Sequence, residues 1–310
     1  MTTADQPSSR RIFRLILGGV LTVAVCFFVV RSLVVQWNSI KSFDWQIKPI
    51  WLLISALLMW LDFVLLFQLW RIVLRTISGH ELRFSSAYRI LTLSNLGKYI
   101  PGKIWTITGM VYLVGLEGVP AKPALVSSAL HQAFTLIPGA VFATSVLGVG
   151  IWGTVSPWAV GIGMAIGILL LYPPLFRWLL NKGLQLFGRE PIEFQLSFAR
   201  AFGLFWLYVA AWILYGASFW CMNLGIGLPD SPFWPVSAAY CAAYIVGFVA
   251  IFAPGGLGVR EGVLAITLAP FVPTGLAAAV AVVSRFWMTL VELAGMLPVL
   301  FGYGKSDRKS

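Results

Sequence analysis

The chain has 310 residues, of which 59% are hydrophobic and 11% charged, whereas soluble domains carry about 25% charged residues. Its mean hydropathy of +0.87 and its net charge of +11 exclude a disordered, fibrous or disulfide-stapled secreted protein. The three cysteines (Cys26, Cys221 and Cys241) lie in apolar stretches, and the two histidines (His80 and His131) have no ligand cluster around them. We therefore predict a multi-span membrane protein with no metal site and no cofactor.

Six continuous apolar segments reach the length needed to cross a bilayer, which is about 20 residues. The first follows Arg10, Arg11 and Arg14, and we expect a retained helix because the run is long and no small-residue cleavage site follows it. Two further segments are equally apolar but are interrupted near the middle by Pro-Gly. The predicted spans cover residues 15–35, 50–70, 124–147, 158–176, 201–224 and 275–301, and the interrupted segments cover 85–116 and 233–272.

The Lys and Arg residues of the short loops orient these spans, because cytoplasmic loops are enriched in both. Basic residues gather at the N-terminus, in the loops after Trp70 and Phe176, and at the C-terminus, whereas the alternate loops contain only Arg31, Lys41 and Lys48. We expect residues 1–310 to form one polytopic membrane domain with both termini cytoplasmic. The positive net charge follows from this bias and from attraction to anionic lipid, so no nucleic-acid partner is expected.

The interrupted segments do not fit a simple alternation of membrane crossings. The loops at 71–84 and 117–123 must both be cytoplasmic for the later spans to alternate, so residues 85–116 have to enter and leave on the same side. Each arm of about 14 residues reaches about 21 Å, which is short of the roughly 30 Å hydrocarbon core. We predict two re-entrant hairpins that turn at Pro101-Gly102 and at Pro254-Gly255-Gly256, the second entering from the outer side.

The two interrupted segments are also similar in sequence. Pro101-Gly102-Lys103-Ile104 parallels Pro254-Gly255-Gly256-Leu257, and Val119-Pro120 parallels Val272-Pro273, at a constant offset of 153 positions. Because the copies enter from opposite sides, the repeats are expected to be inverted, one over about 12–150 and the other over about 157–303. The predicted fold class is an all-α integral membrane protein, a helical bundle of two inverted repeats that each contain a re-entrant hairpin. Such a transporter-like architecture places the substrate where the broken helices meet.

A broken helix inside a membrane exposes backbone amides that need a polar partner. A half-helix starting at Lys103 or Val259 would direct its free N–H groups and positive dipole end into the membrane, where glycines let a phosphate approach. Alternatively, both breaks are surface loops whose cations reach lipid headgroups; we favour a site, because charges held at membrane depth are usually functional. The candidate substrate-binding residues are Asn95, Lys98, Pro101, Gly102, Lys103, Trp105, Pro254, Gly255, Gly256, Gly258, Arg260 and Glu261.

Four titratable residues within the spans form a candidate charge network: Arg285, Glu292, Asp62 and His131. Arg285 and Glu292 are seven residues apart, or two helical turns, so they share a face of the last span. Glu261 is stabilised by the dipole of the half-helix it begins, and either Arg260 or Arg285 is within its reach. Two interpretations of this network remain: its residues form a structural ion pair, or they take part in the movement of substrate or protons. His131 is equally consistent with an ordinary buried hydrogen bond.

Taken together, the stretch from Asn95 to Trp105, the stretch from Pro254 to Gly262 and Arg285 resemble the lysylphosphatidylglycerol synthase transmembrane-region family. The likeness covers roughly residues 50–302. It implies a flippase-like domain, also found as stand-alone inner-membrane proteins, that moves an anionic or lipid-linked headgroup between leaflets. Relatives that make aminoacyl-lipids carry a large cytosolic synthase domain after the membrane part. Because this sequence ends at Ser310, we do not expect synthase activity here.

The leading prediction is therefore a lipid flippase-like transporter and not an enzyme. Its expected partners are membrane lipids with an anionic or phosphate-bearing headgroup, and no oligomeric state is predicted. One alternative is a membrane-embedded transferase or hydrolase acting on a lipid-linked phosphate or sugar, which would need a base among Asp62, His131, Glu261 and Glu292. The other is a non-catalytic scaffold of an envelope-biosynthesis complex, which would bind protein partners and move no lipid by itself.

Overall fold

The computed structural model is all-helical, with no strand in the parts of the chain that it describes. The predicted first span, the arginines before it and the segment Ile100–Lys103 fall outside these parts, apart from Val34 in the span. The described residues are 34, 37–99, 104–152, 157–186, 191, 193–228, 231–250, 253–273 and 275–302.

Within these ranges, four helices are long and apolar enough to cross a membrane, so the protein is a multi-pass membrane protein. They confirm the spans predicted over 50–70, 124–147, 201–224 and 275–301. The long helices are α3 (Pro49–Ser78), α6 (Ala121–Trp152), α9 (Phe198–Gly225) and α12 (Ala277–Gly302).

The ends of the long helices follow from local sequence. Pro49 begins α3, where its missing N–H would have had no helical partner. Gly79 ends α3 in the left-handed conformation (φ 70°) and donates its N–H to Arg75 O at 2.9 Å. The hydroxyl of Ser197 accepts the N–H of Arg200 and so caps α9.

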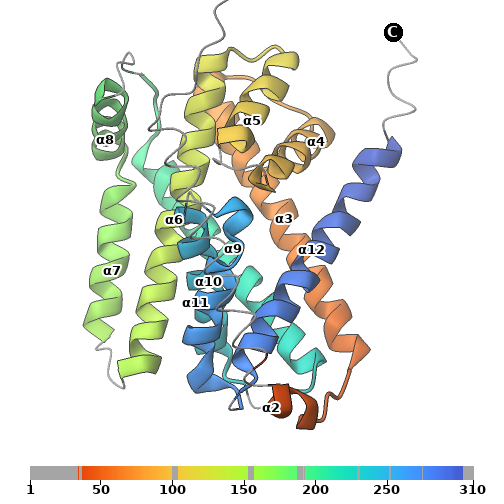
Figure 1. Cartoon of the computed structure of the whole chain (residues 1–310). Helices are drawn as coiled ribbons and strands as arrows, with labels where there is room; N and C mark the ends of the chain where they lie inside the picture. Colours follow the sequence, from red (N-terminus) through yellow and green to blue (C-terminus); the bar gives the residue numbers. More distant parts are fainter. Residues whose placement is uncertain are drawn as a thin grey trace, which may run out of the picture.

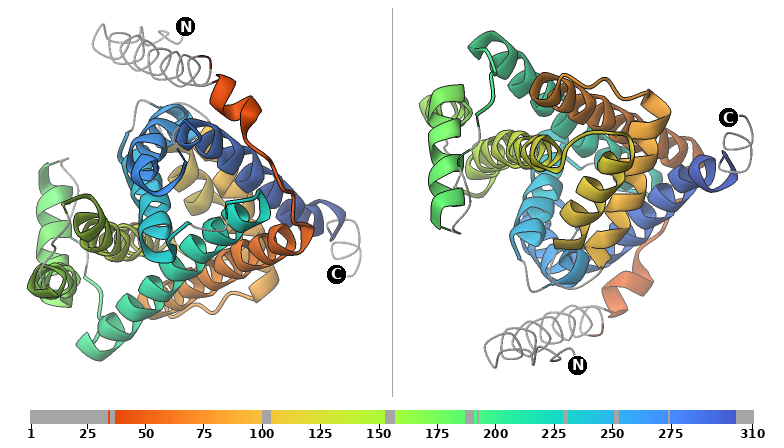
Figure 2. Two further views of the ribbon diagram at one scale, coloured as in Figure 1. Left: turned by 90° about the horizontal axis from the view of Figure 1, so that it is seen from below. Right: turned by 90° about the horizontal axis from the view of Figure 1, so that it is seen from above.

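The predicted span over 158–176 is not one straight helix. The structure ends α7 (Pro157–Leu170) before a short break and begins α8 (Pro173–Leu186) at a double proline. The apolar parts of the two helices meet at an angle of 63°. Prolines 173 and 174 lack the N–H groups that would continue α7, and their rings clash with the preceding turn. The pair stands at one side of the molecule, beyond α6 (Figure 2).

The two interrupted segments fold as pairs of short helices. The first pair is α4 (Phe84–Asn95) and α5 (Ile104–Leu116), and a 3-10 turn, η1 (Leu96–Tyr99), follows α4. With 12 and 13 residues, these helices reach only about 18–20 Å along their axes. They pack against each other in the upper half of the view in Figure 1.

The second pair consists of α10 (Phe233–Val249) and α11 (Val259–Leu268), with a second 3-10 turn, η2 (Pro254–Gly256), between them. These two helices also pack against each other, in the lower half of the same view (Figure 1). The 3-10 turn η3 (Ala269–Phe271) leads toward α12, and a short helix, α2 (Trp37–Ser42), precedes α3.

Helices α3 and α9 share the most extensive contact in the described structure. The hydroxyl of Ser55 donates to Ser218 O at 2.7 Å, and the hydroxyl of Ser218 donates to Ser55 O at 2.9 Å. Trp287 of α12 donates its indole N–H to Ser55 Oγ at 2.9 Å. These bonds satisfy buried polar groups and tie α12 to these two helices.

Candidate functional site

The two helix breaks meet inside the molecule: η1 packs against η2. Each turn is the tip of a helix pair, and the pairs reach the contact from opposite ends of the molecule (Figure 1). The sequence predicted that the breaks converge, and the structure brings them together.

The second tip depends on glycine. Gly255 and Gly256 have φ values of 58° and 71°, a region that residues with a Cβ avoid. A Cβ on Gly256 would lie 2.9 Å from the carbonyl oxygen of Gly247, so η2 rests directly on the backbone of α10. The close contact explains why two consecutive glycines follow Pro254.

The first tip is packed in a similar way. Gly97 is buried in η1, and a Cβ on it would lie 2.6 Å from the backbone N of Thr106 in α5. Glycine at this position therefore lets the turn lie against the first turn of α5. Three predicted site residues, Pro101, Gly102 and Lys103, lie between η1 and α5 and outside the described residues.

An ion pair joins the first tip to α12. Lys98 Nζ lies 2.6 Å from Glu292 Oε1 and 2.7 Å from Oε2. The two side chains are only 24% and 16% exposed, so water screens the pair less than an ion pair on the surface. Lys98 was predicted as a substrate contact and Glu292 as part of a charge network. In the structure, the two residues form an ion pair with each other.

A second ion pair joins the other tip to the same helix. Arg285 Nε lies 3.5 Å from Glu261 Oε1, and Arg285 Nη2 donates to Gly255 O at 2.9 Å. Glu261 Oε2 also accepts the N–H of Gly258 at 2.6 Å, which caps the start of α11. Of the two arginines that the sequence left open for Glu261, its ion-pair partner is Arg285.

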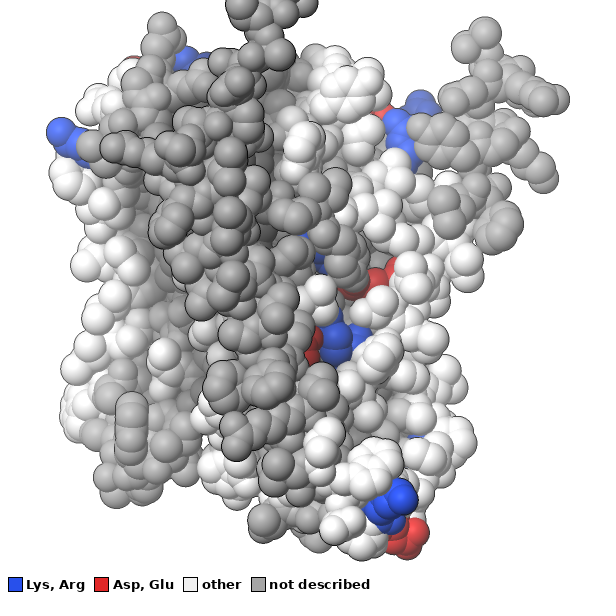
Figure 3. All heavy atoms as spheres, viewed as in Figure 1, with Lys and Arg blue, Asp and Glu red and all other residues white. Residues whose placement is uncertain are grey.

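Helix α12 therefore holds both tips with two charges of opposite sign. Arg285 and Glu292 are two turns apart on one face of α12, as predicted, and each contacts a different helix break. In the space-filling view, one group of charged atoms reaches the surface about halfway along the face, and the other visible charged atoms lie toward its upper and lower ends (Figure 3). The arrangement makes α12 a clamp across the meeting point of η1 and η2.

Arg260 has a different environment from the other cations. It is 5% exposed, and its guanidinium lies 5.0–5.8 Å from the ring centroids of three tyrosines, which we call the tyrosine box: Tyr215, Tyr240 and Tyr244. Arg260 donates an N–H to the hydroxyl of Tyr215. The described residues contain no ion pair to Arg260. Its charge is stabilised by aromatic faces, and in this conformation it is not presented to a headgroup.

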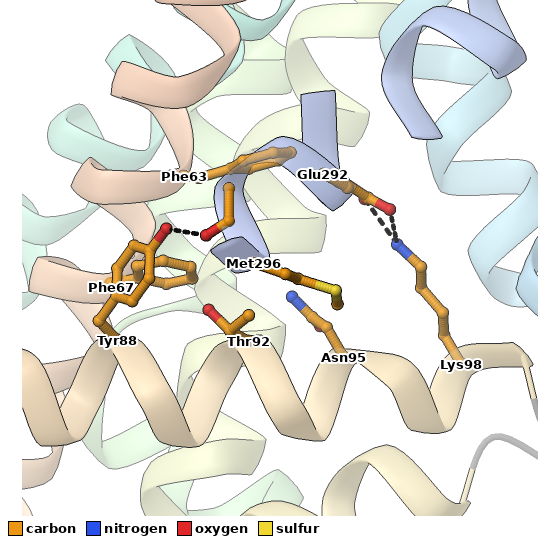
Figure 4. Close-up of a pocket in the computed structure, with 9 residues that line it drawn as sticks. Phe63, Phe67, Tyr88, Thr92, Asn95, Lys98, Glu292 and Met296 are labelled. Atoms are coloured by element: carbon orange, nitrogen blue, oxygen red, sulfur yellow. Dashed lines mark hydrogen bonds and ion pairs between the residues drawn. The ribbon is translucent and has the colours of Figure 1, made fainter. Parts of the chain in front are cut away.

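A small pocket opens beside the Lys98–Glu292 pair (Figure 4). Its volume of about 40 Å³ has room for a few water molecules but not for a phosphorylated headgroup. The face of α4 and η1 that lines it carries side chains spaced at helical intervals, and the hydroxyl of Tyr88 donates across it to Gly295 O. The lining residues are Phe63, Phe67, Tyr88, Thr92, Asn95, Lys98, Glu292, Gly295 and Met296.

The remaining predicted residues are dispersed. Asn95 lines the pocket, but Trp105 is 54% exposed on α5 and does not. His131 of α6 forms a hydrogen bond with the hydroxyl of Tyr208, which belongs to another part of the core. Asp62 is buried in α3 and takes no part in either ion pair.

Sequence reasoning missed the tyrosine box and most of the pocket lining. Tyr240 and Tyr244 are four residues apart in a run of small residues, a spacing that places two rings on one helix face and that could have drawn attention to them. Tyr215 comes from α9, and nothing local to it indicates that it approaches Arg260. Phe63 and Met296 were indistinguishable from lipid-facing apolar residues.

Comparison with known protein families gives a match over most of the chain. A family model described as Lysylphosphatidylglycerol synthase TM region matches residues 15–295. The matched range includes both tips, the tyrosine box and the part of α12 that carries Arg285 and Glu292. A search of curated proteins found no match to the chain.

Proposed function

The chain belongs to the lysylphosphatidylglycerol synthase TM region family, and from this premise we propose that it is a flippase for lipids with an anionic, phosphate-bearing headgroup. The observation that carries the proposal is that both helix breaks are held by charges on α12 in the interior of a membrane protein. Charged side chains at this depth are costly and usually serve transport. We propose movement of the headgroup across the inner membrane, not covalent chemistry, as the activity.

Lys98 and Arg285, the cations of the two ion pairs, each already pair with a carboxylate of the protein itself. Glu292 holds Lys98, and Glu261 both pairs with Arg285 and caps α11. A headgroup phosphate offers the same kind of charged oxygens and would compete for Lys98, for Arg285 and for the N–H groups at the start of α11. The described conformation therefore corresponds to a closed state whose anion positions are filled from within.

Competition of this kind links binding to movement. A phosphate that displaces Glu292 or Glu261 releases α12 from one tip, and α12 is then free to move away from η1 or from η2. The pocket of about 40 Å³ requires such a movement before a headgroup can enter. A ligand shifts a conformational equilibrium only as far as it binds one state more tightly than the other. Here the headgroup would bind the open state more tightly, because only in that state does it replace Glu292 or Glu261 as the partner of a cation.

The membrane arrangement that fits this activity has the two helix pairs as re-entrant hairpins from opposite sides, within inverted repeats and with cytoplasmic termini. The antiparallel placement of the pairs and their meeting at η1 and η2 support this arrangement. Cysteines introduced at Gly102 and Gly255 would then be shielded from impermeant thiol reagents. Free labelling of these cysteines from opposite sides would show that the breaks are surface loops and that they form no buried headgroup site.

The proposal is tested by following lipid movement in proteoliposomes. Phosphatidylcholine vesicles containing a trace of acyl-labelled fluorescent phosphatidylglycerol are treated with an impermeant quencher, which reports the outer-leaflet fraction over time. Lys98→Ala should slow the exchange at least tenfold, because a charge-assisted hydrogen bond contributes about 1.5–3 kcal/mol. Lys182→Ala on α8 is the matched control and should behave as the wild type.

Two outcomes would refute the proposal. One is a wild-type protein that exchanges the labelled lipid no faster than protein-free vesicles. The other is a Lys98→Ala protein that exchanges it as fast as the wild type while the control variant is also unaffected.

A further inference from the structure

Asp62 is an acid buried in the middle of a membrane-spanning helix. It is 2% exposed and lies 13 residues after the start of the 30-residue helix α3, which is about 20 Å along the helix axis. Neither ion pair of the clamp involves it. The site described so far therefore gives no account of this residue.

One carboxyl oxygen of Asp62 also lacks a polar partner. Its buried Oδ1 atom has no hydrogen bond, and the described residues provide no ion pair to it. An unpaired carboxylate in such a place is far more costly than the neutral acid, so the conformation fits a protonated Asp62. Glu261 and Glu292 differ from it, because each has a cation within 3.5 Å. A buried polar group without partners stabilises nothing, so its presence calls for a functional reason.

Two groups of α10 lie near Asp62. Cys241 and Tyr244 of α10 are close enough to interact with it electrostatically, and Tyr244 belongs to the tyrosine box around Arg260. Asp62 is therefore linked to the site through one aromatic side chain. The titratable groups on the other helices packed against α3 are Arg200, Tyr208, Tyr215 and Cys221 of α9, Lys122 and His131 of α6, Tyr88 and Arg89 of α4, and Arg285 and Glu292 of α12.

Helix α12 covers the same face of α3. Met59 precedes Asp62 by three residues and so shares its face, and Met59 packs against Met288 and Val291 of α12. Glu292 is the next residue of α12 and carries the ion pair to the first tip. Any displacement of α12 that follows the loss of that ion pair also loosens the cover over Asp62.

From this geometry we infer that Asp62 is a proton-binding site that couples headgroup movement to the proton gradient; the inference rests on the proposed function. When α12 moves and water reaches the carboxylate from one side, Asp62 takes one proton from that water. The neutral acid is then buried as the protein closes. When the site opens to the other side, the proton returns to water and the carboxylate is regenerated. One proton crosses for each headgroup, and no bond to carbon is made or broken.

The test uses the full chain in the fluorescent phosphatidylglycerol vesicles described above. An imposed pH gradient is combined with equal potassium and valinomycin on both sides, so that the membrane potential is zero. The outer-leaflet fraction of labelled lipid and the internal pH, read with a trapped pH dye, are followed together. Asp62→Asn mimics the neutral acid but carries no exchangeable carboxyl proton. Asp44→Asn, which makes the same change at an exposed position before α3, is the matched control.

In the wild type and in Asp44→Asn, the pH gradient should shift the leaflet ratio at least twofold, with a proton flux that requires the labelled lipid. In Asp62→Asn, the shift and the flux should both be lost, while labelled lipid still exchanges without a gradient. Wild-type exchange with no effect of the gradient and no proton flux would overturn the inference and leave the proposed function intact. So would an Asp62→Asn protein that keeps the flux. If the wild type moves no lipid, the proposed function and the inference fail together. The wild-type flux tests the coupling to the proton gradient even if Asp62→Asn does not fold, and its absence alone overturns the inference.

Discussion

The ion pair between Lys98 and Glu292 makes opposite predictions for stability and for transport. At about 2.7 Å and an effective dielectric constant of about 20, the two charges attract each other by roughly 6 kcal/mol. Much of this is offset by the cost of taking both groups out of water. Replacing one partner by methionine leaves the other charge largely buried without this ion pair, so Lys98→Met and Glu292→Met should each destabilise the fold by about 3 kcal/mol.

The double variant Lys98→Met/Glu292→Met should recover nearly all of that loss. An apolar pair of similar volume removes both desolvation costs at once, and such replacements are often neutral or stabilising. The measurement is equilibrium unfolding in mixed detergent micelles, followed by tryptophan fluorescence. Transport by the double variant should still be abolished, because it has lost the cation that we assign to the phosphate.

Additive losses would refute this reasoning. If the double variant is destabilised by the sum of the single losses, the two side chains do not interact. Single variants within about 1 kcal/mol of the wild type would mean that water screens the charges as on an open surface.

Two further predictions concern the packing of the tip and of the tyrosine box. Gly97→Ala should destabilise the fold by about 1–3 kcal/mol, because the new Cβ would lie 2.6 Å from the backbone N of Thr106. The same change at Gly115, where a Cβ meets open space, should be neutral or stabilising. Thermal unfolding of the two variants measures both effects, and equal effects would contradict the close contact between Gly97 and α5. Arg260→Lys should cost about 2 kcal/mol, because an ammonium group cannot cover three rings and reach the tyrosine hydroxyl together. Arg200→Lys, at an exposed position of α9, is its control in the same unfolding assay, and an unchanged Arg260→Lys protein would contradict the assigned role.

The long helices could be predicted because their signals are local. Apolar runs of bilayer length and Pro-Gly interruptions are both visible in a single window of sequence, and they identified the four long helices and the positions of both breaks. The bend within the predicted span over 158–176 was missed because hydropathy alone was used there. The prolines at 173 and 174, which were equally visible, control the backbone at that point.

The pairing of the charged residues was harder to predict from the sequence. Residues seven apart on a helix share a face, so Arg285 and Glu292 were placed together correctly. Nothing local indicates that they reach two different tips, or that Glu261 pairs with Arg285. The tyrosine box needs side chains from α9, α10 and α11, and such a meeting depends on tertiary packing. The inverted repeat stays a prediction.

The surroundings of Arg260 have an electrostatic consequence for the whole interior. Lys98 and Arg285 are balanced by Glu292 and Glu261; with Asp62 protonated, as we infer above, the charge of Arg260 is not balanced by either of these two carboxylates. Aromatic faces stabilise a guanidinium without cancelling its field. The centre of the protein therefore carries a positive potential that dissolved ions screen less than the potential of a surface charge. A negatively charged lipid at the rim of the site would be attracted before it touches any side chain, and added salt should weaken this attraction less than the attraction to an exposed arginine.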